Sequence, residues 1–185
     1  MDMLLLERFF RLIKNQFQYG GVKYAQTSEK EATDCLFDDF GKNWLFGTLG
    51  KYCKRYSNLK REKDLLKIAT YCFILWLKRG FHLDEEGTDE IINTTVEVKS
   101  NYFQNFKDEF IGYLGTEDFG WAVVARAKAL ENIYNLLYAF SMIDFNEICE
   151  SDLFDIFYCC YYIWDTEIPS DKKEKDEDVG KINKE

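Results

Sequence analysis

The chain has 185 residues, of which 46% are hydrophobic, 17% aromatic and 31% charged, and its formal net charge at pH 7 is −9. This apolar fraction excludes a globally disordered chain and is enough for one folded domain with a substantial core. The net charge argues against a protein that coats nucleic acid through a general positive field.

The charge is divided unevenly along the chain. Residues 1–80 carry 15 Lys and Arg against 9 Asp and Glu, whereas residues 81–169 carry 4 against 18. A basic half is therefore followed by an acidic half. Two interpretations stay open: the two halves pair with each other, or the basic half contains a site for a small anion.

The sequence predicts a cytoplasmic protein with no membrane span. Asp2, Glu7 and Arg8 interrupt the apolar run at the amino terminus, unlike a signal peptide. The longest apolar run, residues 68–77, is much shorter than the ~20 residues that a membrane helix needs. Six cysteines, one histidine and no Cys-x-x-Cys pair favour reduced, partly buried thiols over a zinc site.

Apolar residues recur at helical spacing from the start of the chain. A first helix should end near Gly20 and Gly21. A second should open at a capping box of Ser28 and Glu31 and stop at Gly41, and a third is expected over residues 44–56.

A fourth helix is predicted from a cap at Ser57 or Asn58 to Arg79, with Gly80 ending it. Its apolar residues surround the helix almost completely, so it should be central. Because these helices follow one another closely, their neighbours should be antiparallel.

The acidic half continues the helical pattern. We expect a fifth helix over residues 89–114, a sixth capped by Thr116, and a seventh opened by a capping box of Asp144 and Glu147. The tail, residues 170–185, has 11 charged residues in 16 and should be flexible. No internal repeat is apparent. The fold prediction is an all-α antiparallel bundle of about seven helices, with residues 1–169 forming one domain.

Three motifs in the basic half carry candidate chemistry, and the first is acidic. Glu31, Asp34 and Asp38 share one face of the second predicted helix. Like charges on one face repel unless a cation compensates, and Mg²⁺ binds through one or two carboxylates plus phosphate oxygens. The alternative is a solvated face, or one paired with downstream lysines.

The second motif is basic. Lys51, Lys54 and Arg55 lie at i, i+3 and i+4, a patch that suits phosphate, and Gly47 lets a backbone approach closely. The Gly-x-x-x-x-Gly-Lys-Ser/Thr pattern of a Walker loop is absent from the sequence.

The third motif places polar side chains on the central helix. Asp64, Lys67 and Tyr71 fall on one line of it and need partners, either the basic patch or a ligand. Tyr52 and Tyr71 are candidates for stacking on a base, although aromatics at helical spacing are more often part of a core.

Together these motifs resemble a family of small phage proteins over residues 19–76. The shared elements are an acidic pair, then Gly47-x-x-x-Lys51-Tyr52-x-x-Arg55, then Asp64-Leu-x-Lys67-x-x-x-Tyr71, with matching spacings. The family includes a kinase that phosphorylates deoxynucleoside monophosphates without a Walker loop. The layout is also similar to that of the all-α nucleoside triphosphate pyrophosphohydrolases, although their second acidic pair is missing here.

The resemblance implies a Mg²⁺-dependent enzyme that transfers or hydrolyses phosphoryl groups of (deoxy)nucleotides. Glu31, Asp34 and Asp38 would hold the metal, and Asp34, Lys51 and Arg55 would be catalytic. The residues implied in substrate binding are Gly47, Lys51, Tyr52, Arg55, Asp64, Lys67 and Tyr71. A polynucleotide is disfavoured, because the acidic half repels a long phosphate chain.

The alternative function is a non-catalytic interaction protein, encoded by a phage or mobile element, that inhibits a host or defence complex. Its acidic half would dock into a basic groove that normally binds nucleic acid. Four aromatic side chains would anchor the contact, or would instead complete the core or a homo-oligomer interface: Tyr158, Tyr161, Tyr162 and Trp164.

Overall fold

A computed structural model describes residues 2–24, 32–81, 101–116, 119 and 128–169, with the side chains of residues 21–24 and 32–35 left aside. All the regular structure in these residues is helical, which confirms the all-α class. The α-helices are α1 (Met3–Tyr24), α2 (Ala32–Leu59), α3 (Glu62–Lys78), α5 (Phe103–Tyr113), α7 (Ala129–Met142) and α8 (Glu150–Glu167). The seven-helix antiparallel bundle, the flexible tail and the single domain over residues 1–169 stay predictions.

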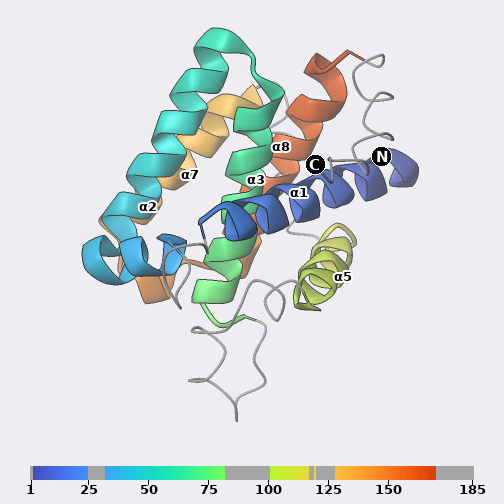
Figure 1. Ribbon diagram of the computed structural model, residues 1–185. Helices are drawn as coiled ribbons and strands as arrows, with labels where there is room; N and C mark the ends of the chain where they lie inside the picture. Colours follow the sequence, from blue (N-terminus) through green and yellow to red (C-terminus); the bar gives the residue numbers. More distant parts are fainter. Residues whose placement is uncertain (1, 25–31, 82–100, 117–118, 120–127, 170–185) are drawn as a thin grey trace, which may run out of the picture.

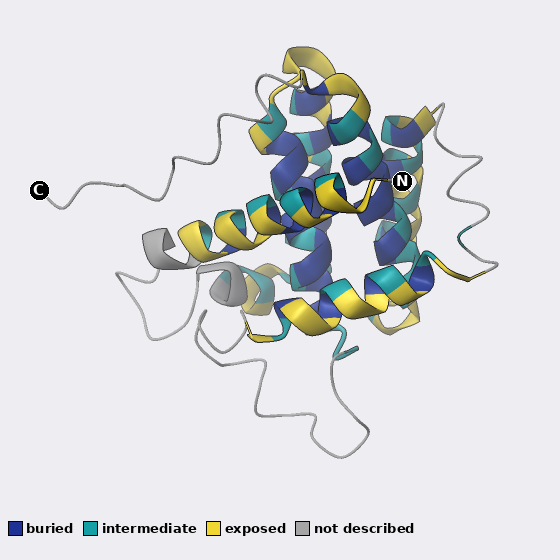
Figure 2. Cartoon of the chain, turned by 90° about the vertical axis from the view of Figure 1, so that its right-hand side faces the viewer, coloured by how far each residue is buried: buried dark blue, intermediate teal, exposed yellow. Residues whose placement is uncertain are grey.

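Helix α3 lies at the centre of the structure, as its sequence predicts (Figure 1). It contacts α1, α2, α5 and α8, while α7 contacts both α2 and α8. Eleven of its 17 residues are buried. Figure 2 shows the buried residues of the described helices gathered toward the interior and the exposed ones on the outside. None of the described helices has the length and apolar character needed to cross a membrane.

Aromatic rings fill the space between α1, α3, α5 and α8. Phe10 stacks on Phe157 with ring centroids 5.0 Å apart, and Phe106 makes an edge contact with Phe157 at 5.2 Å. Offset and edge-to-face contacts of this kind add to the stabilisation from apolar burial. In α8, Tyr158, Tyr161 and Trp164 are buried in the core, so in this structure they are not available to anchor a docked partner.

Buried thiols gather in the helices nearest the centre. Cys53 of α2, Cys72 of α3, and Cys159 and Cys160 of α8 are free and buried, whereas Cys149 is exposed. Burial raises the pKa of Cys53 and of Cys159 to about 12, and it raises the pKa of Cys72 and Cys160 well above the ordinary value. These four thiols are therefore protonated and act as small apolar side chains.

Several helix boundaries differ from the prediction. Helix α1 continues through Gly20 and Gly21 to Tyr24, since glycine costs a helix only about 1 kcal/mol and does not forbid it. The expected cap at Ser57 or Asn58 is wrong, because α2 runs on to Leu59 and the chain reverses at Lys60 (φ 49°).

In the acidic half, the capping box of Asp144 and Glu147 is present, but it opens a 3₁₀ turn, Phe145–Glu147, and α8 begins only at Glu150. The predicted ends at Arg79 and Gly80 agree with the structure, where Gly80 has φ 73°. The start of the second helix at residues 28–31, residues 89–100 of the fifth helix and the start of the sixth helix after Thr116 fall outside the described residues.

The predicted break at Gly41 is confirmed as a kink within α2. Gly41 has φ 61° and ψ −158°, a backbone conformation essentially restricted to glycine. The nine residues before it therefore point in a different direction from residues 42–59 (Figure 1). The kink separates Asp38, which precedes it, from the basic patch, which follows it.

We expect Gly41→Ala to lower the free energy of unfolding by ~1–3 kcal/mol, because a side chain strains this conformation. The matched control is Gly50→Ala in the same helix, where an added Cβ meets no atom within 4 Å. That change should stabilise the protein by ~0.5–1 kcal/mol through helix propensity. Urea denaturation measures both, and equal effects of the two changes would contradict the kink.

Candidate functional site

Six of the residues predicted to bind substrate meet on the face shared by α2 and α3. They form the Tyr52 cluster: Lys51, Tyr52 and Arg55 from α2, and Asp64, Lys67 and Tyr71 from α3. In α2, Arg55 lies three and four residues after Tyr52 and Lys51, and in α3 the residues lie at i, i+3 and i+7, so each set falls on one side of its helix. The short turn at Lys60 and Arg61 brings the two faces together.

The ring of Tyr52 is the centre of this cluster. The Lys51 Nζ lies 4.8 Å from the ring centroid, the Lys67 Nζ 5.0 Å and the Arg55 Cζ 5.3 Å. Each distance is within the range of a cation–π contact. Three cations from two helices therefore converge on one phenol ring.

The ion pair of Arg55 and Asp64 joins the two helices within the cluster. The Arg55 Nε donates to both carboxylate oxygens of Asp64 at 2.8 Å, and the Arg55 Nη2 also donates to Oδ1. Asp64 is 0% exposed, while the side chain of Arg55 is 37% exposed. The hydrogen bond to Asp64 raises the pKa of Arg55, so its guanidinium is fixed both in charge and in orientation.

The charge balance of the cluster is positive. Lys51, Arg55 and Lys67 stand against the carboxylate of Asp64, which Arg55 already occupies. Lys51 is exposed and Lys67 half-buried, so a ligand from solvent can reach both. Cations held this close repel one another, and an anion bound between them would relieve the repulsion.

A row of rings continues from the cluster along the same face. The Tyr52 and Tyr71 ring centroids are 6.1 Å apart with an interplanar angle of 32°, and Trp44 lies 6.3 Å from Tyr71. Sequence reasoning missed Trp44, although it lies seven residues, about two helical turns, before Lys51 and so on nearly the same helix face. All three rings are partly buried and form an aromatic edge beside the cations.

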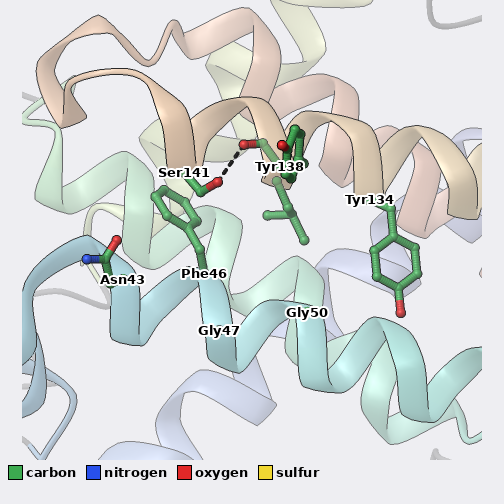
Figure 3. Close-up of a pocket in the computed structure, with 8 residues that line it drawn as sticks. Asn43, Phe46, Gly47, Gly50, Tyr134, Tyr138 and Ser141 are labelled. Carbon is green, nitrogen blue, oxygen red and sulfur yellow. Dashed lines mark hydrogen bonds between the residues drawn. The ribbon is translucent and has the colours of Figure 1, made fainter.

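Gly47 lies apart from the Tyr52 cluster. It faces α7 and lines a pocket of about 280 Å³ with residues that are all uncharged (Figure 3): Asn43, Phe46, Gly50, Tyr134, Leu137, Tyr138 and Ser141. In this pocket the Ser141 hydroxyl donates to the Tyr138 carbonyl at 2.6 Å. The close backbone approach expected of Gly47 would therefore occur here and not beside the cations.

Asp38, one of the predicted metal ligands, also lies away from the cluster. Asp38 is exposed and precedes the kink at Gly41, while Glu31 and the side chain of Asp34 are outside the described residues. From Gly41 to Lys51 the helix advances by ~15 Å. In the part of the chain that the structure describes, no group of three Asp, Glu, Cys or His side chains could hold a metal ion.

Comparisons with known proteins identify no relative. No family model matches the chain, and neither a curated protein nor a solved structure shows significant similarity to it. What the Tyr52 cluster can do therefore follows from its geometry and charge.

We expect Arg55→Ala to destabilise the protein more than Asp64→Asn. The first change leaves the fully buried carboxylate of Asp64 without its partner, and an unpaired buried charge typically costs about 3–5 kcal/mol. The second leaves Arg55 partly exposed to water, which can solvate it. Urea denaturation of both variants measures the difference, and the reverse order would show that the pair does not carry a buried charge.

Proposed function

We propose that the Tyr52 cluster binds the phosphate group of a small anionic ligand of the nucleotide class. The observation that carries this proposal is the convergence of Lys51, Arg55 and Lys67 on one ring with a single carboxylate among them. A phosphate carries two or more acceptor oxygens and up to two charges, which matches such a group of donors.

The rest of a nucleotide has a surface to bind beside the phosphate. The rings of Tyr71 and Trp44 extend away from the cations along α2 and α3, and a planar base can stack on an exposed edge of such a row. The arrangement favours a single nucleotide over a polynucleotide, because the cluster has three cations around one ring and the following half of the chain is acidic.

The proposal extends to Mg²⁺-dependent phosphoryl transfer or hydrolysis in a cytoplasmic, phage-type enzyme. Lys51 and Arg55 would neutralise charge that develops on the transferred phosphate, and positioning with electrostatics would supply the catalysis. Asp34, with Glu31 and Asp38, would hold the metal. The antiparallel bundle predicted for residues 1–169, alone or as a homo-oligomer, would carry this site.

Binding is tested by calorimetry with pyrophosphate and with deoxynucleoside monophosphates. We expect Lys51→Ala and Lys67→Ala each to weaken binding about 5–30-fold, the effect of losing ~1–2 kcal/mol of charge interaction. Lys54→Ala is the matched control: it removes the same charge one turn away, from a side chain with no described contact to the Tyr52 ring. Equal losses in all three variants would indicate a diffuse field and not a site.

Catalysis is tested by incubating the protein with Mg²⁺ and a panel of deoxynucleotides, with and without ATP. Formation of diphosphates indicates a kinase, and release of pyrophosphate indicates a hydrolase. Asp34→Asn should abolish turnover about as fully as Lys51→Ala while leaving metal-free pyrophosphate binding intact. If no nucleotide is turned over or shifts the melting temperature, the enzyme proposal fails and partner docking through the acidic half becomes the favoured function.

A further inference from the structure

Two tryptophan–glutamate hydrogen bonds join α3 and α8 in a reciprocal way. The Trp76 Nε1 near the end of α3 donates to Glu150 at 2.5 Å, and the Trp164 Nε1 near the end of α8 donates to Glu62 at 2.7 Å. Each glutamate is the first residue of its helix. The end of each helix therefore contacts the start of the other, so the pair is antiparallel, and exchanging the two helices leaves the pattern unchanged.

The sequences of α3 and α8 match in the same register. Residues 150–164 follow residues 62–76 by 88 positions without a gap, and six pairs are identical: Glu62 and Glu150, Asp64 and Asp152, Leu65 and Leu153, Ile68 and Ile156, Cys72 and Cys160, and Trp76 and Trp164. Both members of the leucine, isoleucine, cysteine and tryptophan pairs are buried. This match differs from the expectation of no internal repeat.

The equivalence extends to the residues that follow each tryptophan. Arg79, three residues after Trp76, donates to the carbonyl oxygens of Asn146 and Ile148 before α8. Glu167, three residues after Trp164, accepts hydrogen bonds from Tyr56 and Lys60 before α3.

The residues that make these contacts lie at equivalent positions of the two copies. Glu167 lies 88 residues after Arg79, and Ile148 lies 88 residues after Lys60. In the preceding helices, Leu45 and Leu49 of α2 correspond to Ile133 and Leu137 of α7, and all four are buried. The repeat therefore covers a whole helical hairpin, residues 41–79 and residues 129–167.

The cations of the Tyr52 cluster are present in one copy only. The residues equivalent to Lys51, Arg55 and Lys67 are Ala139, Ile143 and Asp155. Asp155 accepts a hydrogen bond from the Tyr113 hydroxyl at 2.5 Å, so its carboxylate serves a contact with α5. The two hairpins share the buried positions named above and the contacts at their ends, and they differ at the site.

We infer that residues 41–79 and 129–167 are two copies of one helical hairpin related by an approximate two-fold axis, and that the last turn of α8 positions the anion site of the first copy. Trp164 and Glu167 of this turn contact Glu62, Lys60 and Tyr56, on both sides of the α2–α3 turn. Arg55 precedes Tyr56, and Asp64 follows Glu62 by two residues. Holding the turn therefore fixes how Arg55 meets Asp64.

Trp164 and Glu62 are thus positioning residues for Arg55, and the ligand-binding part of this inference rests on the proposed function. The second copy supplies a matched control, because Trp76 and Glu150 make the equivalent hydrogen bond away from the cluster. Glu62→Ala and Glu150→Ala each remove the carboxylate that accepts a hydrogen bond from one indole N–H. The two variants should have similarly lowered free energies of unfolding. Only Glu62→Ala should change pyrophosphate affinity and the Arg55 signal.

The experiment measures pyrophosphate affinity by calorimetry and the Arg55 Nε–H resonance by NMR, at a temperature where every variant is folded. Arg55→Lys assigns the resonance. We expect Glu62→Ala to weaken pyrophosphate binding about ten-fold, because a misplaced Arg55 would lose one charge-assisted hydrogen bond to the phosphate. The same change should broaden or shift the Arg55 signal. Glu150→Ala should change neither. Glu62→Gln keeps an acceptor oxygen, so it should keep the wild-type Arg55 signal and, because it removes a negative charge, bind pyrophosphate at least as tightly as the wild type.

Pyrophosphate affinity and the Arg55 signal together distinguish the positioning of Arg55 from a change in charge. Removal of the Glu62 charge by itself favours an anion, so weaker binding in Glu62→Ala does not come from the lost charge. If Glu62→Ala and Glu150→Ala affect affinity and the Arg55 signal equally, the positioning role is wrong. If wild-type protein does not bind pyrophosphate, the proposed function fails, while the Arg55 signal in the two alanine variants still decides the positioning role.

A second pair, Trp164→Phe and Trp76→Phe, removes the donor in place of the acceptor while keeping most of the buried ring. Agreement between the two pairs assigns the effect to the hydrogen bond itself. An Arg55 signal that changes in Glu62→Ala but not in Trp164→Phe would overturn the role of Trp164.

Discussion

The burial of α3 on almost every side is the constraint on which the rest of the structure depends. A helix surrounded by apolar neighbours can carry polar groups only where each has a partner. The buried polar side chains among the described residues are Asp64 and Thr70. Thr70 donates to the Leu66 carbonyl within its own helix, and Asp64 requires Arg55 from α2. The core itself therefore fixes the guanidinium at the centre of the candidate site.

Periodicity was enough to predict the parts of the fold that depend on one helix at a time. The near-continuous apolar surface of α3, the break at Gly41 and the shared face of Lys51 and Arg55 all follow from residue type and spacing. The hairpin turn then brings Lys67 to the same face. This explains why most of the predicted binding residues do meet around Tyr52.

Features that depend on a neighbouring helix could not be predicted in this way. Spacing shows that Gly47 shares a helix with Lys51 but not that its side of the helix meets α7. The glycine pair at residues 20–21 is compatible both with a helix end and with a helix interior, and α1 continues through it. The repeat inferred for the two hairpins is hard to recognise in the sequence because most positions differ between the copies, Lys51, Arg55 and Lys67 among them, although two acidic residues and several buried residues recur.

The buried cysteines of the core can report the order in which the helices unfold. Cys149, just before α8, is exposed, while Cys53, Cys72, Cys159 and Cys160 are shielded inside α2, α3 and α8. Alkylating reagents attack only ionised, accessible sulfur, so in the folded protein these four side chains are protected. The order in which they become modified as denaturant is raised would report which helix separates first from the centre, without any added probe.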